Sequence, residues 1–187
     1  MRLFVAADIP DEVRQAIEVE VVEALRDELP GARWTRPEGR HLTLKFLGNV
    51  ADERVGDVAA AVGSATRGGR RFEASLAEIG AFPDPRRARV LWIGIGDGFE
   101  EFAALAAALD ASLAPLGFVP EQRPFRCHLT LARFKVPQVV AVERSVPERS
   151  FAVDEIVLFR SHLHPKGARY EALARFPLEQ TGRTGPR

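Results

Sequence analysis

The sequence predicts an α+β protein in which two pseudo-symmetric lobes of antiparallel sheet, with helices on the outside, surround a central cleft. The first observation is a phrase of Arg, Pro, three variable residues and His-Leu-Thr-Leu, which begins at Arg36 and again at Arg123 and places its two histidines 87 positions apart. The second is that each copy follows a β-rich segment and then a helical segment, in the same order. Two copies are too few for a solenoid, so a pair of related lobes is the better interpretation.

Three segments carry apolar residues at the spacing of an amphipathic helix. The first follows a turn signal at Pro10 and ends near Pro30, and the third ends near Gly117. The expected helices span 11–29, 52–65 and 99–116.

β-rich sequences occupy most of the remaining chain, and turn residues separate them. The expected strands span 2–8, 32–35, 41–48, 71–82, 88–96, 125–134, 150–163 and 168–178. We expect residues 1–180 to form a single bilobal domain and residues 181–187 to form a flexible tail.

Composition narrows the class of protein. The 26 basic and 26 acidic residues cancel, which argues against a protein that coats long nucleic acid but leaves room for a local phosphate pocket. The single cysteine, Cys127, excludes an intramolecular disulfide and a cysteine-based zinc site. The N-terminus does not read as a signal peptide, and no segment approaches the ~18 apolar residues of a membrane span. A cytoplasmic monomer is therefore expected.

The repeated motif predicts that chemically active side chains share one face of each strand. Successive side chains in a strand point to opposite faces. His41 and Thr43 therefore face one way and the intervening leucines the other, and the same holds for His128 and Thr130. If the lobes face each other, two imidazoles and two hydroxyls converge on one site.

Two histidines on opposite sides of a site suit acid–base chemistry on a phosphodiester. A neutral histidine takes a proton from the attacking hydroxyl or water, and a protonated one gives a proton to the leaving oxygen. A single histidine on a strand is more often structural, but packing does not require the same His-x-Thr pattern twice, so the catalytic interpretation is preferred. No metal or cofactor is expected, because the sequence offers no convincing cluster of carboxylates.

The paired motifs resemble those of the 2H phosphoesterase superfamily, whose fold is described as LigT-like. Four stretches resemble, more narrowly, the bacterial and archaeal RNA 2′,3′-cyclic phosphodiesterases, also called 2′-5′ RNA ligases. These stretches are "RLFVAADIP", "GARWTRPEGRHLTLKFLG", "LGFVPEQRPFRCHLTLARF" and "ARYEALARFPL", and the similarity runs from about residue 2 to residue 178.

The resemblance implies a role for each candidate residue. His41 would be the proton donor to the departing 3′ oxygen of an RNA 2′,3′-cyclic phosphate. His128 would be the proton acceptor that activates water, which leaves a 2′-phosphate end. In reverse, the same site could join a 5′-hydroxyl to the cyclic phosphate as a minor activity. Thr43 and Thr130 would hold the phosphate oxygens.

Three further residues match positions close to the substrate in that family. Arg133 follows the second motif, but strict strand alternation turns it to the leucine side, so it reaches the site only if the strand kinks or ends there. Phe4 and Phe46 match aromatic positions near the terminal base, where stacking is a reasonable use, although each could equally belong to the core.

Three residues outside this set are given structural interpretations. Cys127 stands where proline is common in the family and should face away from His128, as a buried structural thiol. His162 and His164 have a spacing that could offer two metal ligands, but without a third ligand we expect a solvent-exposed pair.

Alternative functions remain open at this point. A cyclic phosphodiesterase for small nucleotides, such as ADP-ribose cyclic phosphate, would share the histidine pair and differ in its binding groove. An RNA-end-binding module without turnover would not need both motifs intact. A metal-dependent hydrolase would lose its activity with a chelator. The expected partner is RNA that ends in a 2′,3′-cyclic phosphate, for example a tRNA fragment, or a small cyclic nucleotide.

Overall fold

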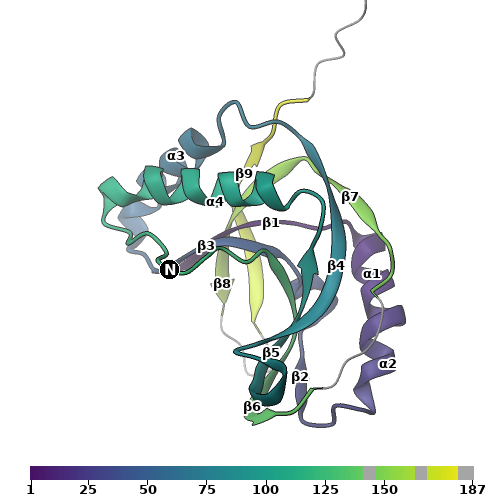
Figure 1. Ribbon diagram of the computed structural model, residues 1–187. Helices are drawn as coiled ribbons and strands as arrows, with labels where there is room; N and C mark the ends of the chain where they lie inside the picture. The colour runs from purple at the N-terminus through teal and green to yellow at the C-terminus, as the bar shows by residue number, and fades with distance from the viewer. Residues whose placement is uncertain (141–145, 163–167, 181–187) are drawn as a thin grey trace, which may run out of the picture.

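The computed structural model describes residues 1–140, 146–162 and 168–180. Within them, nine strands form one sheet with the order β7-β4-β5-β6-β3-β1-β8-β9, and β2 pairs with β6. All pairings between these strands are antiparallel, and the sheet curls strongly (Figure 1). The strands are β1 (Arg2–Ala7), β2 (Ala32–Trp34), β3 (Leu42–Asn49), β4 (Phe72–Phe82), β5 (Ala88–Ile95), β6 (His128–Gln138), β7 (Ser150–Val153), β8 (Glu155–His162) and β9 (Arg169–Pro177).

Three helical regions accompany the sheet, close to the predicted ranges. The first is a continuous run whose middle turn is a π-helix, and the other two combine an α-helix with a short 3-10 turn. The helices are α1 (Asp11–Ile17), the π-helix η1 (Glu18–Val22), α2 (Glu23–Arg26), α3 (Val55–Thr66) and α4 (Phe99–Leu113), with 3-10 turns η2 (Pro37–Gly39), η3 (Asp52–Arg54), η4 (Pro85–Arg87) and η5 (Ala114–Leu116).

The sheet consists of two lobes that meet at one residue pair. Strands β3 and β6 lie next to each other in the sheet through the pairing of Leu42 with Leu129. We call β3, β1, β8 and β9 the β1 lobe, and β6, β5, β4, β7 and β2 the β5 lobe. The predicted α+β fold with pseudo-symmetric lobes is confirmed. The lobes are not simple halves of the chain, however, because the C-terminal strands β8 and β9 complete the lobe that starts at the N-terminus.

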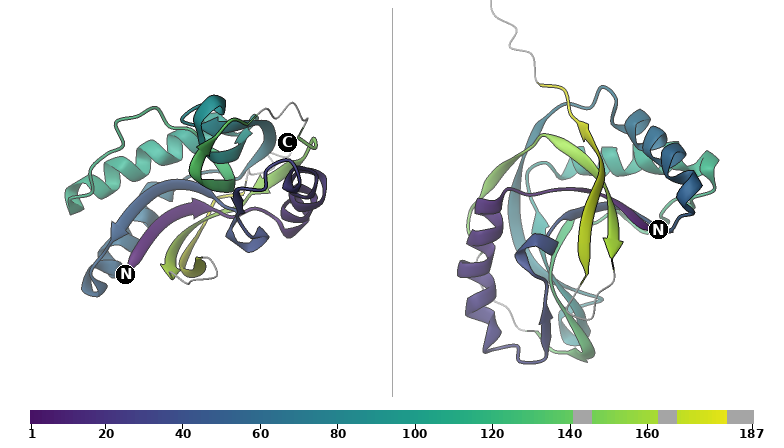
Figure 2. Two further views of the ribbon diagram at one scale, coloured as in Figure 1. Left: turned by 90° about the horizontal axis from the view of Figure 1, so that it is seen from below. Right: turned by 180° about the vertical axis from the view of Figure 1, so that it is seen from behind.

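The helices also cross between the halves of the sequence. Helix α4 follows β5 in the chain, yet it contacts β3 of the β1 lobe and packs against α3. Helix α3 contacts β8 and β9. The run α1–η1–α2 lies at the other end of the curled sheet, beside β4 and β7 (Figures 1 and 2). Among the described residues, no helix is long and apolar enough to cross a membrane.

The core fixes which face of each strand is available to a ligand. The leucines of both motifs are buried, and Leu42 and Leu129 have no exposed surface. They belong to one cluster of buried apolar residues that extends through both lobes. A second, small cluster lies on the opposite face of the β1 lobe and consists of Phe4, Ala6, Val157 and Phe159, with Tyr170 packed against it.

Some predicted boundaries were wrong. The first helical run ends at Arg26 instead of residue 29, and β6 begins at His128 instead of residue 125 and continues to Gln138. The single strand predicted over 150–163 is two strands, β7 and β8, separated at Asp154. The predicted tail over 181–187 lies outside the described residues.

Candidate active site

The register between the lobes brings the two motifs together. Leu42 and Leu129 are direct partners in an antiparallel pair. The same register places His41 opposite Thr130 and Thr43 opposite His128, and side chains of directly opposite residues point to the same face. The two histidines and two threonines are therefore neighbours on the face that the leucines leave free. This face, between the lobes, is called the cleft face below.

A β-bulge in β6 decides the direction of Arg133. Thr130 pairs with Trp92 of β5 and Ala132 pairs with Leu91, so Leu131 between them is the extra residue. Leu131 and Ala132 are both fully buried, and the alternation restarts one residue later. Arg133 is thereby on the same face as His128 and Thr130. Strict alternation, which predicted the leucine side, fails at this bulge.

The first motif has the same irregularity. In the pairing of β3 with β1, Thr43 is opposite Ala6 and Lys45 is opposite Val5, so Leu44 is the extra residue. Phe46 consequently returns to the cleft face, five positions after His41, as Arg133 lies five positions after His128. Phe46 and Arg133 are thus equivalent positions of the two lobes, one aromatic and one cationic.

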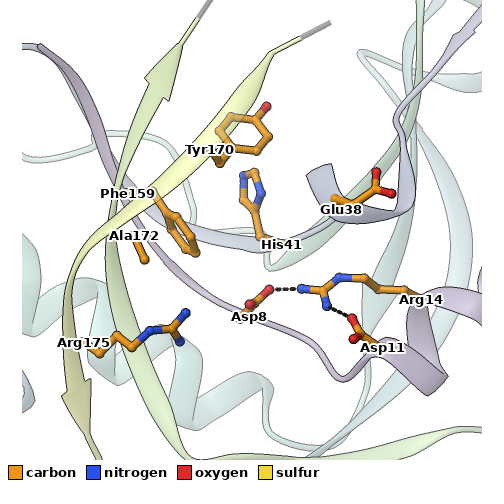
Figure 3. Close-up of a pocket in the computed structure, with 9 residues that line it drawn as sticks. All are labelled: Asp8, Asp11, Arg14, Glu38, His41, Phe159, Tyr170, Ala172 and Arg175. Carbon is orange, nitrogen blue, oxygen red and sulfur yellow. Dashed lines mark hydrogen bonds and ion pairs between the residues drawn. The ribbon is translucent and has the colours of Figure 1, made fainter.

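His41 lies in a pocket of about 270 Å³ (Figure 3). The ring of Phe4 stacks on it at a centroid distance of 4.6 Å, and Tyr170 meets it edge-on at 4.9 Å. Burial lowers the pKa of His41 to about 4, and the charges of Arg14, Arg133 and His128 act in the same direction, whereas the carboxylate of Asp8 opposes them. The imidazole of the free protein is therefore neutral near pH 7.

Asp8 is the acidic group that acts on His41. Ala7 pairs with Leu42, so one further step of this register places Asp8 opposite His41. The Asp8 carboxylate forms an ion pair with Arg14 of α1 and accepts a hydrogen bond from the backbone N–H of Ile9 (3.1 Å). Arg14 also pairs with Asp11 at 2.5 Å, so the carboxylate that faces His41 is held in place from the helix.

Arg40, the residue before His41, anchors the motif to the first helical run. Its side chain is completely buried and forms an ion pair with Glu18 of the π-helix. It also donates hydrogen bonds to the carbonyl oxygens of Arg14 (3.1 Å) and Thr35 (3.2 Å). Because a buried guanidinium is costly unless its donors are paired, this network fixes the chain where it enters β3.

His128 has a defined tautomer. Its Nδ1 lies 2.7 Å from the carbonyl oxygen of Arg126, and since that oxygen only accepts, Nδ1 carries the proton. Nε2 is then left with its lone pair. Burial lowers the pKa of His128, with a further contribution from the charge of Arg133, while the bond to the Arg126 carbonyl opposes the shift.

An aromatic group also flanks His128. The ring of Phe82 meets it edge-on at 5.0 Å and Trp92 lies at 6.2 Å, with Phe82 and Trp92 5.1 Å apart. Gly80 makes room for this arrangement, because a Cβ there would lie 2.3 Å from the Trp92 ring.

The surroundings of the two histidines differ in charge at one equivalent position. Asp8 is opposite His41 in the β1 lobe, whereas Gly94 is the partner of His128 in the β5 lobe. A carboxylate next to an imidazole favours its protonated form. The charge of Asp8 therefore acts on the pKa of His41, whereas the pKa of His128 is shifted by burial, by the bond to the Arg126 carbonyl and by Arg133.

The structure separates the two aromatic candidates. Phe4 is only 3% exposed and lies beneath His41, so it offers a ligand almost no surface. Phe46 is 66% exposed on the cleft face. Base stacking is therefore available to Phe46, while the position of Phe4 suits support of the His41 ring.

The structural interpretation of Cys127 is confirmed. The side chain is buried, and burial raises the pKa of its thiol. His162 is partly exposed, and its Nε2 lies 2.8 Å from a carboxylate oxygen of Glu171. His164 lies outside the described residues. Within the described parts of the chain, no three His, Cys, Asp or Glu side chains gather in a way that could hold a metal ion.

Sequence reasoning missed Asp8, Arg14, Arg40 and Trp92. Asp8 ends the first predicted strand, and nothing in its local pattern distinguishes it from a surface turn residue. The one usable signal was Arg40, a charged residue directly before a motif histidine. Its complete burial depends on packing against α1 and η1, which the linear pattern does not show.

Comparison with known proteins agrees with this geometry. The family model described as "LigT like Phosphoesterase" matches the chain twice, over residues 8–92 and 93–170, so the chain belongs to the LigT-like phosphoesterase family. The double match reflects the repeated motif. Each match contains one of the two histidines.

Several relatives carry a more specific name. The RNA 2′,3′-cyclic phosphodiesterases of Methanothermobacter thermautotrophicus and Archaeoglobus fulgidus are 32% and 35% identical over 95% and 94% of this chain, and over 99% of each relative. Among solved structures, TT0787 of Thermus thermophilus has a TM-score of 0.79 at 34% identity, covering 97% of this chain and 100% of that one. Escherichia coli LigT complexed with 3′-AMP has a TM-score of 0.75 at 28% identity, covering 96% and 98%.

Proposed function

We propose that the protein hydrolyses 2′,3′-cyclic phosphate ends of RNA to 2′-phosphates, with His41 as proton donor and His128 as proton acceptor. The observation that carries this proposal is the single pairing of Leu42 with Leu129, which makes neighbours of two imidazoles and two threonine hydroxyls on one face. The names of relatives 32% and 35% identical over almost the whole chain support the same reaction.

His128 has the properties of the base. Its proton is on Nδ1, held by the Arg126 carbonyl, so Nε2 can accept a proton from water. Its lowered pKa keeps it neutral near pH 7. The water oxygen then forms a bond to phosphorus while the bond from phosphorus to the 3′ oxygen breaks.

His41 supplies the proton that the departing 3′ oxygen needs. In the free protein this imidazole is neutral near pH 7, because burial lowers its pKa to about 4. The bound cyclic phosphate brings a negative charge, and an anion nearby raises the pKa of an imidazole. The carboxylate of Asp8 already acts in that direction at His41. The choice of His41 as the acid follows from the resemblance of the first motif to that of the 2H phosphoesterases, and the charge of Asp8 assists its protonation.

The remaining cleft-face residues bind the substrate. Thr43 and Thr130 donate hydrogen bonds to non-bridging phosphate oxygens, each from beside the histidine of the other strand. Arg133 adds a positive charge close enough to both imidazoles to lower their pKa values. Phe46 offers an exposed ring on which the terminal base stacks.

Two activities would share this site. Reversal of the reaction joins a 5′-hydroxyl to the cyclic phosphate in a 2′-5′ linkage, and water at its normal concentration makes hydrolysis dominant. A cyclic phosphodiesterase for small nucleotides, such as ADP-ribose cyclic phosphate, would use the same histidines. A monomeric state and a cytoplasmic location also stay predictions.

The test is incubation with an oligonucleotide that ends in a 2′,3′-cyclic phosphate, in excess EDTA. We expect a 2′-phosphate product, and a loss of about 100-fold or more in kcat for His41→Ala and for His128→Ala. His162→Ala is the matched control, since this histidine lies on β8 and pairs with Glu171. Turnover of either motif variant within a few fold of the parent would exclude the two-histidine mechanism, and a product with only a 3′-phosphate would exclude the assumed geometry.

A further inference from the structure

A second arginine lies directly opposite Arg133. In the pairing of β2 with β6, Arg33 and Arg133 are partners, flanked by the pairs Ala32–Phe134 and Trp34–Ala132. Ala32 and Trp34 pack against the hydrophobic core. Arg33, between them, therefore points to the opposite face, which is the cleft face, and its side chain lies beside that of Arg133.

Two like charges in direct cross-strand contact destabilise a sheet unless an anion lies between them. Some other exposed arginines have acidic partners, as in the pairs Arg71–Asp154 (3.0 Å) and Arg149–Glu20 (2.8 Å), but these arginines do not face a second arginine across a strand pair. Neither Arg33 nor Arg133 has a carboxylate partner within residues 1–140, 146–162 and 168–180. Both guanidinium groups are exposed, with their donors free for a ligand.

The position of this pair relates it to the histidines. Arg133 is three residues beyond Thr130 on the same strand, roughly 10 Å at most along β6. Arg133 acts electrostatically on His41 and His128, and Arg33 is its cross-strand partner on the neighbouring strand β2. An anion held by both arginines would lie next to the phosphate at the histidines, about one nucleotide away along a strand.

We infer that Arg33 and Arg133 form a second phosphate site, which holds the phosphodiester on the 5′ side of the terminal nucleotide and so selects RNA ends over cyclic mononucleotides. This inference rests on the proposed function. A guanidinium is well suited to a phosphate, because its planar donors bind two oxygens at once. Arg33 is then a substrate-binding residue that specifies a chain of at least two nucleotides.

The test compares two substrates that differ by one nucleotide and one phosphodiester. They are adenosine 2′,3′-cyclic phosphate without a 5′-phosphate, and the dinucleotide ApA that ends in a 2′,3′-cyclic phosphate. We expect Arg33→Ala to lower the ratio of kcat/KM for the dinucleotide to that for the mononucleotide by about tenfold or more, as expected for one charge-assisted contact. Arg33→Lys keeps the charge and should lower the ratio less.

The matched control is Arg67→Ala, which removes another exposed arginine, the residue directly after helix α3. It should leave the ratio unchanged. A second control uses the unchanged protein with a dinucleotide whose internal phosphodiester is a neutral methylphosphonate. Its kcat/KM should fall at least as far as Arg33→Ala reduces that of the natural dinucleotide, and Arg33→Ala should cause no further loss on the methylphosphonate substrate.

The outcomes separate this inference from the proposed function. If the protein hydrolyses both substrates but Arg33→Ala leaves the ratio unchanged, or lowers both rates equally, the second phosphate site is wrong and the hydrolysis stands. The same holds if the methylphosphonate is turned over as fast as the natural dinucleotide. If neither cyclic phosphate is hydrolysed, the proposed function and the inference are both wrong.

Discussion

One difference between the surroundings of the two histidines is Asp8, which is opposite His41 where Gly94 is opposite His128. The chain thus keeps the same His-x-Thr pattern twice and varies the charge beside it. Burial lowers the pKa of both imidazoles, and the two therefore start neutral near pH 7. The carboxylate of Asp8 makes a proton on His41 less costly than burial alone would make it.

The lowered pKa values of His41 and His128 predict the pH dependence of kcat/KM. In the proposed mechanism the active free protein has His41 protonated and His128 neutral. Because kcat/KM reports the free protein, its bell-shaped pH profile should peak between pH 4 and 6.5. Asp8→Asn should lower the pKa of His41 further, and a decrease of about one would lower kcat/KM at neutral pH about tenfold. Imidazole NMR titration and pH–rate profiles measure both effects.

Asp11→Asn is the control for this variant, because Asp11 also pairs with Arg14 and lines the same pocket but is not opposite His41. It should leave the titration of His41 almost unchanged. If Asp8→Asn left the His41 titration where it is in the parent, the carboxylate would have no part in setting the acid.

Strands and their irregularities determine which side chains reach the cleft face. The bulges at Leu44 and Leu131 return Phe46 and Arg133 to the side of the histidines. A glycine in β4 also affects the cleft, because Gly80 leaves room for the Trp92 ring beside His128. The cleft therefore depends on backbone features that lie outside the two motifs.

Gly80→Ala tests this dependence. The new Cβ would overlap the Trp92 ring, and the displacement should cost about 1–3 kcal/mol of unfolding free energy and lower kcat through His128. Gly56→Ala is the matched control, since a Cβ there meets nothing within 4 Å in helix α3 and should stabilise by about 0.5–1 kcal/mol. Urea unfolding measures the stability of both variants, and turnover measures their kcat. If Gly80→Ala and Gly56→Ala changed stability and kcat equally, the steric explanation would be contradicted.

The whole molecule is held together across the cleft by one core. Buried residues of both lobes belong to the same apolar cluster, although β3 and β6 share only the pairing of Leu42 with Leu129. Helix α4 adds to this connection, because Lys45 of β3 forms an ion pair with its Asp110 at 2.5 Å. The lobes should therefore unfold together.

Leu42→Ala tests this cooperativity. Removing a fully buried leucine should cost about 2–5 kcal/mol. Because both tryptophans lie in the β5 lobe, their fluorescence reports on that lobe, while far-UV circular dichroism reports on the whole sheet. The two signals should give one coincident transition in the parent and in the variant. A fluorescence transition that separates from the dichroism would show lobes that unfold independently.

Local patterns in the chain were enough to predict the α+β class, the approximate helices and the faces of His41, Thr43, His128 and Thr130. These follow from periodicities of two and 3.6 residues, which depend only on neighbours along the chain. The resemblance carried by the two motifs extended that prediction to a reaction. It also supplied Arg133 and Phe46 as candidates, without a reason for them to face the cleft.

Long-range pairing decided the rest. The bulge that turns Arg133 toward the histidines, the pairing of Arg33 with Arg133 and the alignment of Asp8 with His41 all depend on strand registers between distant parts of the chain. A register shift of one residue reverses the face of every side chain beyond it, and no local pattern reports such a shift. The two histidines are therefore recognisable in the linear sequence, whereas Asp8 beside His41 and Arg33 beside Arg133 come together only in the folded sheet.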